Sequence, residues 1–303
     1  MRVVALALTG LSSHASAAVV FWDGEFNADW TLGTNWSLNA APGAADTAVI
    51  LSAGFVNQPV VDRNVTVART DVVSGTLRVA AELTSPVDVS QRLGNLVVDA
   101  LGGITGDVNF GDIFAADGGI ATNNGTITGN VTMWGGTFNN AGVITGNTTI
   151  NGGTFNLLDG SNLRNSSSLS VFSGALRLGT PETIGSLSLA SDSELIAERL
   201  LSVQGIASLG GTLRFDATGL ALGGDFIEAE ILRAGSIVSG FSALDISGLS
   251  GYTVSSRIAQ GDRSASYLLG FSRATQVPEP SSLVLMLPLL GLLTAVSRRR
   301  AIR

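Results

Sequence analysis

The chain of 303 residues contains no cysteine and no lysine, and its single histidine, His14, lies close to the N-terminus. All 17 basic residues are therefore arginine. Without cysteine the protein can form no disulfide bonds, so packing and backbone pairing must hold it together. Because the chain has no cysteine and no histidine beyond His14, residues 15–303 cannot supply a cysteine nucleophile, a Ser-His-Asp triad, or a histidine-bearing zinc or iron site.

Positive charge is scarce in the main part of the chain. Between Ala18 and Val296 there are 12 arginines and 24 acidic residues, which gives a net charge of −12. Scattered negative charge argues against nucleic acid and against anionic surfaces as partners.

The N-terminal segment 1–17 has the three parts of a secretory signal peptide. Arg2 supplies a basic start, Val3 to Leu11 an apolar stretch, and Ala15 and Ala17 the small residues of a signal peptidase site. A first buried strand over Val3 to Leu11 is the alternative. On the signal-peptide interpretation, the mature protein starts at Ala18 and has no histidine.

The C-terminal segment 277–303 combines a proline motif, an apolar segment and a basic tail. Val277, Pro278, Glu279 and Pro280 precede an uncharged stretch from Ser282 to Val296, and Arg298, Arg299, Arg300 and Arg303 follow it. As a helix, the stretch would span roughly 22 Å, and snorkelling residues or local thinning can fit it to a bilayer core of roughly 30 Å. The arginines predict a cytoplasmic C-terminus. A buried core helix is the alternative.

This segment resembles the PEP-CTERM sorting domain of Gram-negative bacteria, with all three parts in order. The resemblance implies transient membrane insertion and cleavage near the motif by an exosortase, a membrane-embedded cysteine transpeptidase. It also implies passage through the inner membrane to the cell surface or the medium, and association with exopolysaccharide or biofilm. It covers under a tenth of the chain.

A repeat occupies the middle of the chain. Residues 123–139 and 140–156 align without a gap with 12 identities in 17 positions. A looser triplet of a small residue, a second residue and an apolar one recurs with a mean period of about 19 residues. Its copies begin at Gly136, Gly153, Gly174, Ser193 and Gly211, and Gly75 begins an earlier candidate.

Short alternating segments bounded by turn residues indicate strands, and the period suits one coil of a solenoid. The sequence therefore predicts an all-β protein, a parallel β-helix (β-solenoid) with an N-terminal signal peptide and a C-terminal single transmembrane sorting helix. An antiparallel β-sandwich is the alternative. The expected inward pairs are Ile127 with Ile144, Met133 with Ile150, and Phe138 with Phe155, with Thr132 and Thr149 outward. Asn130 with Asn147, and Asn139 with Asn156, are expected at coil corners, where asparagine tolerates a left-handed backbone.

The ends of the exported region differ from its middle. The pattern formed by Trp22, Trp30, Asn35, Trp36, Pro42 and Asp46 resembles the start of many exported β-helix proteins, including autotransporter-type repeat proteins. It predicts a cap over the first coil; a sugar-binding aromatic platform is the alternative. The expected division is signal peptide 1–17, cap and first strands 18–60, repeats 61–215, closing unit 216–271, linker 272–276 and sorting signal 277–303.

Candidate catalytic residues are limited to carboxylates, arginines and hydroxyls. The acid clusters are Asp23, Glu25 and Asp29; Asp107, Asp112 and Asp117; Asp192, Glu194 and Glu198; and Asp225, Glu228 and Glu230. A glycosidase needs two carboxyls across a cleft, but solvated turns produce the same pattern. Acids gathered in a cleft with an arginine and an aromatic would favour an enzyme, and acids spread over turns a structural protein.

Other ligand classes find little support. The aspartate spacing does not match an EF-hand, although calcium at a turn stays open. A Thr-x-Thr file of the kind found on ice-binding solenoids breaks where Thr126 and Thr128 meet Val143 and Thr145. We predict no catalytic, cofactor-binding or metal-binding residues. The favoured function is a structural or adhesive surface protein, with a polysaccharide lyase or glycosidase on the same scaffold as the alternative.

Overall fold

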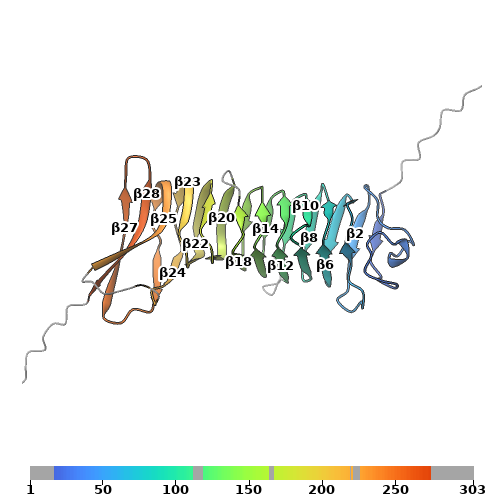
Figure 1. The fold of residues 1–303 in the computed structure, drawn as a ribbon, viewed down its shortest axis with the longest axis horizontal. Coiled ribbons are helices and arrows are strands. Elements are labelled where there is room, and N and C mark those ends of the chain that lie inside the picture. Colours follow the sequence, from blue (N-terminus) through green and yellow to red (C-terminus); the bar gives the residue numbers. More distant parts are fainter. Residues whose placement is uncertain (1–16, 112–118, 164–166, 219, 221–225, 274–303) are drawn as a thin grey trace, which may run out of the picture.

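The protein is a rod of about eight β-solenoid turns, with almost no helix (Figure 1). The computed structural model describes residues 17–111, 119–163, 167–218, 220 and 226–273. Parallel pairing runs along the rod from Val19 to Ser247. This pairing excludes the antiparallel sandwich.

Each coil contributes strands to three faces, and the strands of a face stack along the axis. The first face contains β1 (Val19–Phe21), β2 (Thr47–Ile50), β5 (Arg69–Val72), β8 (Asp88–Gln91), β11 (Val108–Phe110), β14 (Val131–Met133), β17 (Thr148–Ile150) and the first parts of β20 (Ser168–Leu178) and β22 (Ser186–Ala197). The second contains β3 (Val60–Val61), β6 (Thr76–Val79), β9 (Asn95–Val98), β12 (Ile120–Asn123), β15 (Thr137–Asn140), β18 (Thr154–Leu157), the second parts of β20 and β22, β24 (Thr212–Asp216) and β26 (Ala243–Ser247).

The third face has the shortest strands. It contains β4 (Val65–Thr66), β7 (Glu82–Thr84), β10 (Gly103–Thr105), β13 (Thr126–Thr128), β16 (Val143–Ile144) and β19 (Asn162–Leu163). It continues with β21 (Glu182–Ile184), which pairs with the start of β23 (Leu201–Ser208), and that strand pairs with β25 (Phe226–Ser239).

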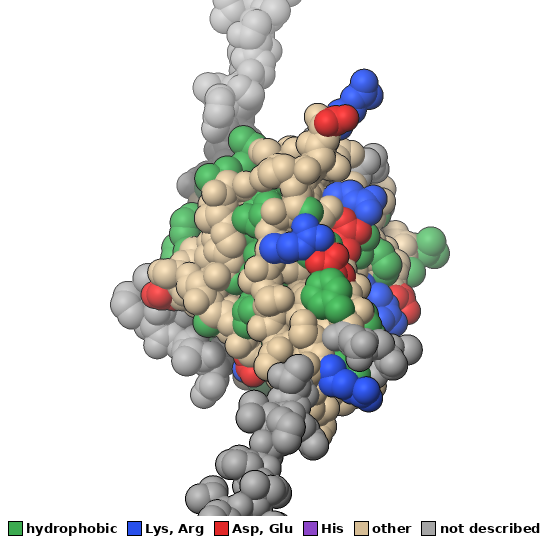
Figure 2. Space-filling view, turned by 90° about the vertical axis from the view of Figure 1, so that its left-hand side faces the viewer, with side chains coloured by type: hydrophobic (Ala, Val, Ile, Leu, Met, Phe, Trp, Pro, Cys, Tyr) green, Lys and Arg blue, Asp and Glu red, His purple; other side chains and the backbone are tan. Residues whose placement is uncertain are grey.

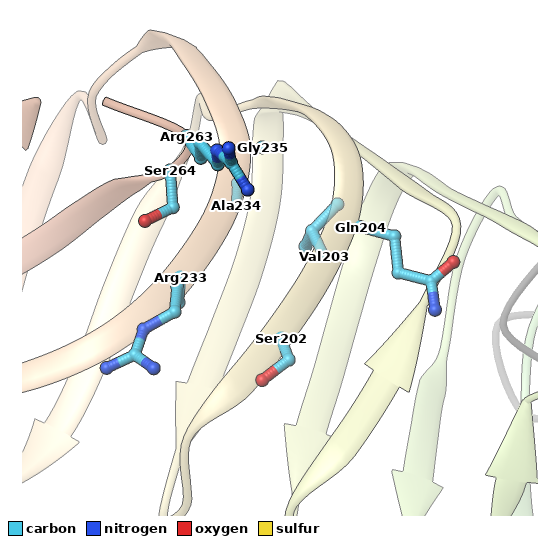
Figure 3. A pocket seen from close by; sticks show the side chains of 8 residues that line it. All are labelled: Ser202, Val203, Gln204, Arg233, Ala234, Gly235, Arg263 and Ser264. Carbon is cyan, nitrogen blue, oxygen red and sulfur yellow. The ribbon is translucent and has the colours of Figure 1, made fainter. Parts of the chain in front are cut away.

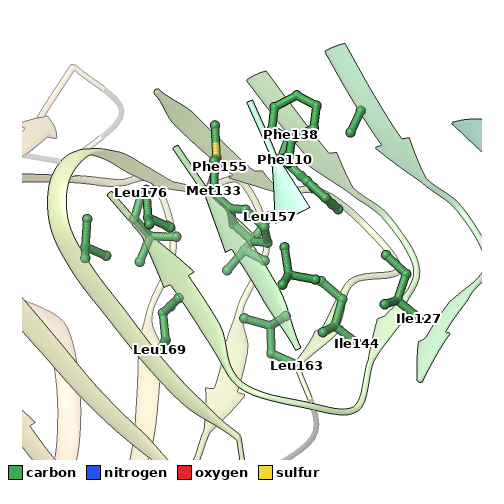
Figure 4. Close-up of a cluster of buried hydrophobic side chains, with 14 of the residues drawn as sticks. Phe110, Ile127, Met133, Phe138, Ile144, Phe155, Leu157, Leu163, Leu169 and Leu176 are labelled. Atoms are coloured by element: carbon green, nitrogen blue, oxygen red, sulfur yellow. The ribbon is translucent and has the colours of Figure 1, made fainter. Parts of the chain in front are cut away.

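The register of the predicted repeat is confirmed. Ile127 pairs with Ile144, Met133 with Ile150, and Phe138 with Phe155, and all six side chains are buried. The two phenylalanine rings stack with centroids 5.1 Å apart (Figure 4). Thr132 and Thr149 pair on the outer side and are half-buried. Each coil thus places an apolar side chain on the one before it, which is why no coil can bury its inner side alone.

The triplets mark one corner of the coil. Gly75, Gly136, Gly153, Gly174 and Gly211 all have positive φ values, between 63° and 90°, and the residues after them enter the second face. The apolar residues of the triplets form one inward column that continues through Leu176, Leu195 and Leu213. Glycine recurs there because other L-residues are strained at positive φ.

The asparagine prediction was correct at one corner and wrong at the other. Asn130 and Asn147 do lie at a corner, where the backbone NH of Asn147 donates to Asn130 Oδ1 (2.9 Å). Neither has a positive φ; before Asn130 the positive φ belongs to Gly129, and before Asn147 Gly146 has none. Asn139 and Asn156 lie in β15 and β18, because strand alternation after Phe138 turns Asn139 outward; their side chains still bond (2.8 Å).

A tryptophan cluster closes the N-terminal end. Trp22, Trp30 and Trp36 are each 1% exposed, and Trp36 contacts the other two edge-on, with ring centroids 5.0 and 4.7 Å away. Backbone bonds of Trp30 and Ala28 to Val60 place this segment against β3, ahead of the first complete coil. The three rings therefore present no open face to a sugar, which rules out the platform alternative for them.

The asparagine and the aspartate of the same pattern also have structural roles. Asn35 is buried, and its amide accepts from the NH groups of Phe26 and Asn27 and donates to Asn27 Oδ1 and to the carbonyl of Asp29. Asp46 accepts from the NH groups of Ala18 and Gly43, both at 2.8 Å. The residues that carried the resemblance therefore build the cap.

The C-terminal end of the rod changes to antiparallel pairing. There, β28 (Ala265–Arg273) lies between β25 and β27 (Tyr252–Gln260) and runs antiparallel to both. Seen from this end, acidic and basic side chains lie beside one another, with hydrophobic side chains scattered among uncharged ones (Figure 2). Tyr267 and Phe271 of β28 are buried and cover the interior of the last coil.

The predicted targeting segments lie almost wholly outside the described residues, which begin at Ala17 and end at Arg273. Within the described residues, no helix has the length and apolar character needed to cross a membrane. The segment from Ser282 to Val296 is not among them.

Candidate functional site

About half of the acidic side chains in the described part of the chain form ion pairs with arginines, and several of these arginines lie one coil away. Arg78 pairs with Asp99 (2.8 Å), Arg177 with Glu198 (2.5 Å), and Arg214 with both Glu194 (3.0 Å) and Asp245 (2.9 Å). Arg69 of β5 similarly lies 2.7 Å from Asp71 and 3.0 Å from Asp88 of β8. Because each arginine reaches across neighbouring strands, these contacts follow the stacking of coils.

Among the described members of the predicted acid clusters, no two carboxylates line the depression found on the rod. Asp29 accepts from the NH and the hydroxyl of Thr31, whereas Glu25 is exposed. Asp107 holds the NH of Asn130 at a corner, and Asp192 contacts Ser191. Asp112, Asp117 and Asp225 lie outside the described residues.

Glu228 and Glu230 are each engaged by an arginine within the closing sheet. Arg257 donates from Nε and Nη2 to Glu228 (2.7 and 2.9 Å), and Arg233 does the same to Glu230 (3.0 and 2.7 Å). These hydrogen bonds lower the pKa of both carboxyls. The pKa values of Asp29 and Asp216 are lowered too, by hydrogen bonds from Thr31 and Thr218.

Lowered pKa values keep these carboxylates ionised at neutral pH. A glycosidase needs one carboxyl with a raised pKa to protonate the leaving group. The shifts at Asp29, Asp216, Glu228 and Glu230 have the opposite direction, because each lowers the pKa of its carboxyl. The electrostatics therefore suit ion pairs better than acid catalysis.

Sequence reasoning missed a carboxylate that turns into the solenoid. Glu182 of β21 is 7% exposed and accepts from the hydroxyl of Ser161 (2.7 Å) and from the NH groups of Leu163 and Thr183 (3.3 and 3.1 Å). Its position next to Pro181, between two apolar segments, gave no signal. With these donors around it, Glu182 holds β19 to β21.

A shallow depression of about 190 Å³ lies where β23 and β25 meet the turn between β27 and β28. Ser202 and Gln204 line it from β23, Arg233 from β25, and Arg263 and Ser264 from the turn. Figure 3 shows Arg263 beside Gly235, whereas the side chain of Arg233 extends away from Gly235. No carboxylate lines the depression, so it lacks the acid pair of a glycosidase.

One corner of the rod carries exposed aromatic side chains. Trp134 follows β14 at the corner between the first two faces and is 42% exposed, and Phe172 holds the same corner two coils later with 56% exposed. Asn151 occupies the coil between them. We call Trp134, Asn151 and Phe172 the aromatic edge. The sequence alone contains Trp134, but only the strand register shows that Phe172 aligns with it.

The columns of outward side chains beside the aromatic edge carry hydroxyl groups, and negative charge begins one coil beyond Phe172, at the exposed Asp192 that pairs with Ser173. Thr132, Thr149, Ser170 and Ser188 form a column on the first face, and Thr137 and Thr154 form another on the second. The Thr-x-Thr file on the third face breaks as expected, because Thr126 pairs with Val143. For the described residues, no three His, Cys, Asp or Glu side chains come together as a metal site.

Comparison with protein families identifies the C-terminal signal. Residues 276–300 match the PEP-CTERM protein-sorting motif. No curated protein and no solved structure matches the chain. The motif implies export, processing by an exosortase and a destination at the cell surface. The protein is thus an exported β-solenoid that carries a PEP-CTERM sorting motif.

Proposed function

We propose that the protein is a structural or adhesive component of the cell surface or extracellular matrix, associated with exopolysaccharide. The observation that carries this proposal is the distribution of the described acids, about half of which pair with arginines along the rod while none lines the depression. A rod of stacked coils offers a long rigid surface, which suits a matrix component.

Export takes place in two steps under this proposal. Signal peptidase removes residues 1–17, recognising Ala15 and Ala17. The segment from Ser282 to Val296 then holds the chain in the inner membrane, with Arg298, Arg299, Arg300 and Arg303 on the cytoplasmic side, until an exosortase cuts near the Val277 to Pro280 motif.

The aromatic edge supports contact with neutral glycans. Aromatic rings stack on the apolar faces of sugar rings, while hydroxyl and amide groups beside them supply hydrogen bonds. Coils repeat about every 4.8 Å, so Trp134 and Phe172 lie about 10 Å apart along the axis. A neutral chain lying along this corner would meet both rings and avoid the repulsion that an acidic polymer would experience.

Binding to insoluble neutral polysaccharides such as cellulose and chitin tests the adhesive function. We expect the exported protein to sediment with at least one of them, and W134A and F172A each to weaken binding about tenfold or more. F226A is the matched control, because Phe226 is equally exposed (57%) but lies in the closing unit. Equal binding by all variants would contradict the role of the aromatic edge, and no binding to any polysaccharide would contradict the adhesive function.

Fluorescence gives an independent readout of the same contact. Trp22, Trp30 and Trp36 are buried, so Trp134 is the tryptophan that iodide can reach. Bound glycan should protect it, and the quenchable signal should disappear in W134F. Quenching that persists in W134F would show that another indole is open.

A carbohydrate-active enzyme on the same scaffold is the second candidate, favoured by the depression that contains Arg263. Within the described residues Arg263 has no ion-pair partner, so its guanidinium is free to hold an acidic sugar. Polysaccharide cleavage by the exported protein, lost in R263A, would support this candidate. The absence of cleavage products across a panel of neutral and acidic polysaccharides would exclude it for those substrates.

A further inference from the structure

The backbone nitrogen of Ala18 is held by a carboxylate. It donates to Asp46 Oδ1 at 2.8 Å, and Asp46 Oδ2 accepts from the NH of Gly43, also at 2.8 Å. The carbonyl of Ala18 accepts from the NH of Thr47 (2.8 Å), so the residue is held on both sides. No arginine of the described chain forms an ion pair with Asp46, so no cation competes for this carboxylate there.

Ala18 is also the residue that the proposed signal peptidase cut would leave at the N-terminus. The cut hydrolyses the bond between Ala17 and Ala18: water adds, Ala17 leaves with a carboxylate, and the nitrogen of Ala18 takes a proton and becomes an ammonium group. Ala17 is exposed, whereas Ala18 and Asp46 are half-buried, so the change from amide to ammonium occurs where the solenoid begins.

We propose that Asp46 is a built-in receptor for the new α-ammonium group, so that processing converts a hydrogen bond from an uncharged amide into an ion pair, with charge on both partners, that fastens the first strand. Such bonds are stronger than neutral ones. Asp46 also joins β1 to the rest of the rod through its backbone, because its carbonyl accepts from the NH groups of Ala68 and Arg69. The pair therefore links the terminus, the cap and the strand after them. This inference rests on the cut after Ala17.

The lack of lysine makes the proposal directly measurable. With no lysine in the chain, the α-amino group of the mature protein is its only primary amine. An N-hydroxysuccinimide ester transfers its acyl group to the unprotonated amine and releases N-hydroxysuccinimide and a proton. The acylation rate therefore reports on this one nitrogen, without correction for other amines.

The experiment compares folded exported protein with the variants D46N and D159N. Asp159 is an exposed aspartate that forms no hydrogen bond or ion pair with the described residues, so D159N is the matched control. At neutral pH we expect D46N to react about five- to tenfold faster than the wild type, because one unit of amine pKa corresponds to a tenfold change in unprotonated amine. D159N should react at the wild-type rate, and all three should react equally in denaturant.

Salt dependence keeps the test decisive if D46N fails to fold. High salt weakens a charge pair that is partly open to solvent, so the folded wild type should react faster in about 1 M salt than in about 0.02 M, relative to the unfolded protein. A wild-type amine that reacts at the unfolded rate at both salt concentrations would overturn the pair alone. A mature N-terminus at a residue other than Ala18, found by intact mass, would overturn the assigned cut together with the pair.

Discussion

Asn123 donates a hydrogen bond from its side-chain amide to the side-chain oxygen of Asn140, one coil later, at 2.7 Å inside the solenoid. Both residues are buried, and each also bonds the backbone two residues ahead, at Gly125 and Gly142. A polar pair in an apolar column is tolerated because nearly every polar atom has a partner.

Replacing Asn140 by alanine should therefore destabilise the protein by about 2–3 kcal/mol, because the buried amide of Asn123 loses its acceptor and the carbonyl of Gly142 loses one of its two donors, keeping only the NH of Asn162. N139A is the control in the same strand: Asn139 is half-buried and faces outward, so its loss should cost less than about 1 kcal/mol. Denaturant unfolding of both variants measures the difference. Equal costs would contradict the inward position of Asn140.

The corner glycines should resist substitution for two separable reasons. Gly153 has φ +79°, and a Cβ there would also clash with the carbonyl oxygen of Gly136. Gly251 has φ +77° with open space around it. We expect G251A to cost about 1–2 kcal/mol from the backbone alone, and G153A about 3 kcal/mol or more. If G153A and G251A lose equal amounts of unfolding free energy in denaturant unfolding, the spacing between coils must relax to accept the methyl group at Gly153.

The closing sheet should become less stable in acid. Hydrogen bonding from Arg257 lowers the pKa of Glu228 below its usual 4.5, so the folded state binds fewer protons than the unfolded state. The stabilisation is present above the usual pKa and is lost as pH falls through the lowered one. Stability measured from pH 7 to pH 3 should show a gap between wild type and E228Q that closes in acid, whereas E25Q, which alters an exposed glutamate, should show no gap. A stability difference between wild type and E228Q that does not change with pH would contradict the predicted contribution of the Arg257–Glu228 ion pair.

The sorting signal predicts the C-terminus of the exported protein. Intact-mass measurement should find a chain that ends near Pro278 to Pro280, without the segment from Ser282 to Val296. In a host lacking an exosortase, the same protein should keep its full tail. Exported protein that retains Arg303 in the presence of the exosortase would contradict this processing.

Much of the fold could be predicted because the duplication fixes the register. Once residues 123–139 are aligned with 140–156, Phe138 must lie under Phe155, and the glycine triplets extend the same column to Leu213. Strand alternation alone would also have turned Asn139 outward and Asn140 inward, had the strand been extended past Phe138.

Other features had no local signal. The parallel pairing of β24 with β26 joins residues 31 positions apart in sequence, beyond the period of the repeat. The sequence predicted a closing unit over 216–271, but nothing in it indicated that β27 and β28 pair antiparallel. The aromatic edge depends on aligning Trp134 with Phe172 across two coils of unequal length, a difference that only the hydrogen-bond register resolves.

The asparagine pair shows how the rod can have lengthened. Asn123 and Asn140 hold the same place in the two copies of the repeat, so the duplication itself supplied the partner for each amide. A gene segment copied in frame brings its own matching surface, because the top of one unit already fits the bottom of the next. The length of the rod is therefore a quantity that recombination can change one unit at a time, without redesign of either end.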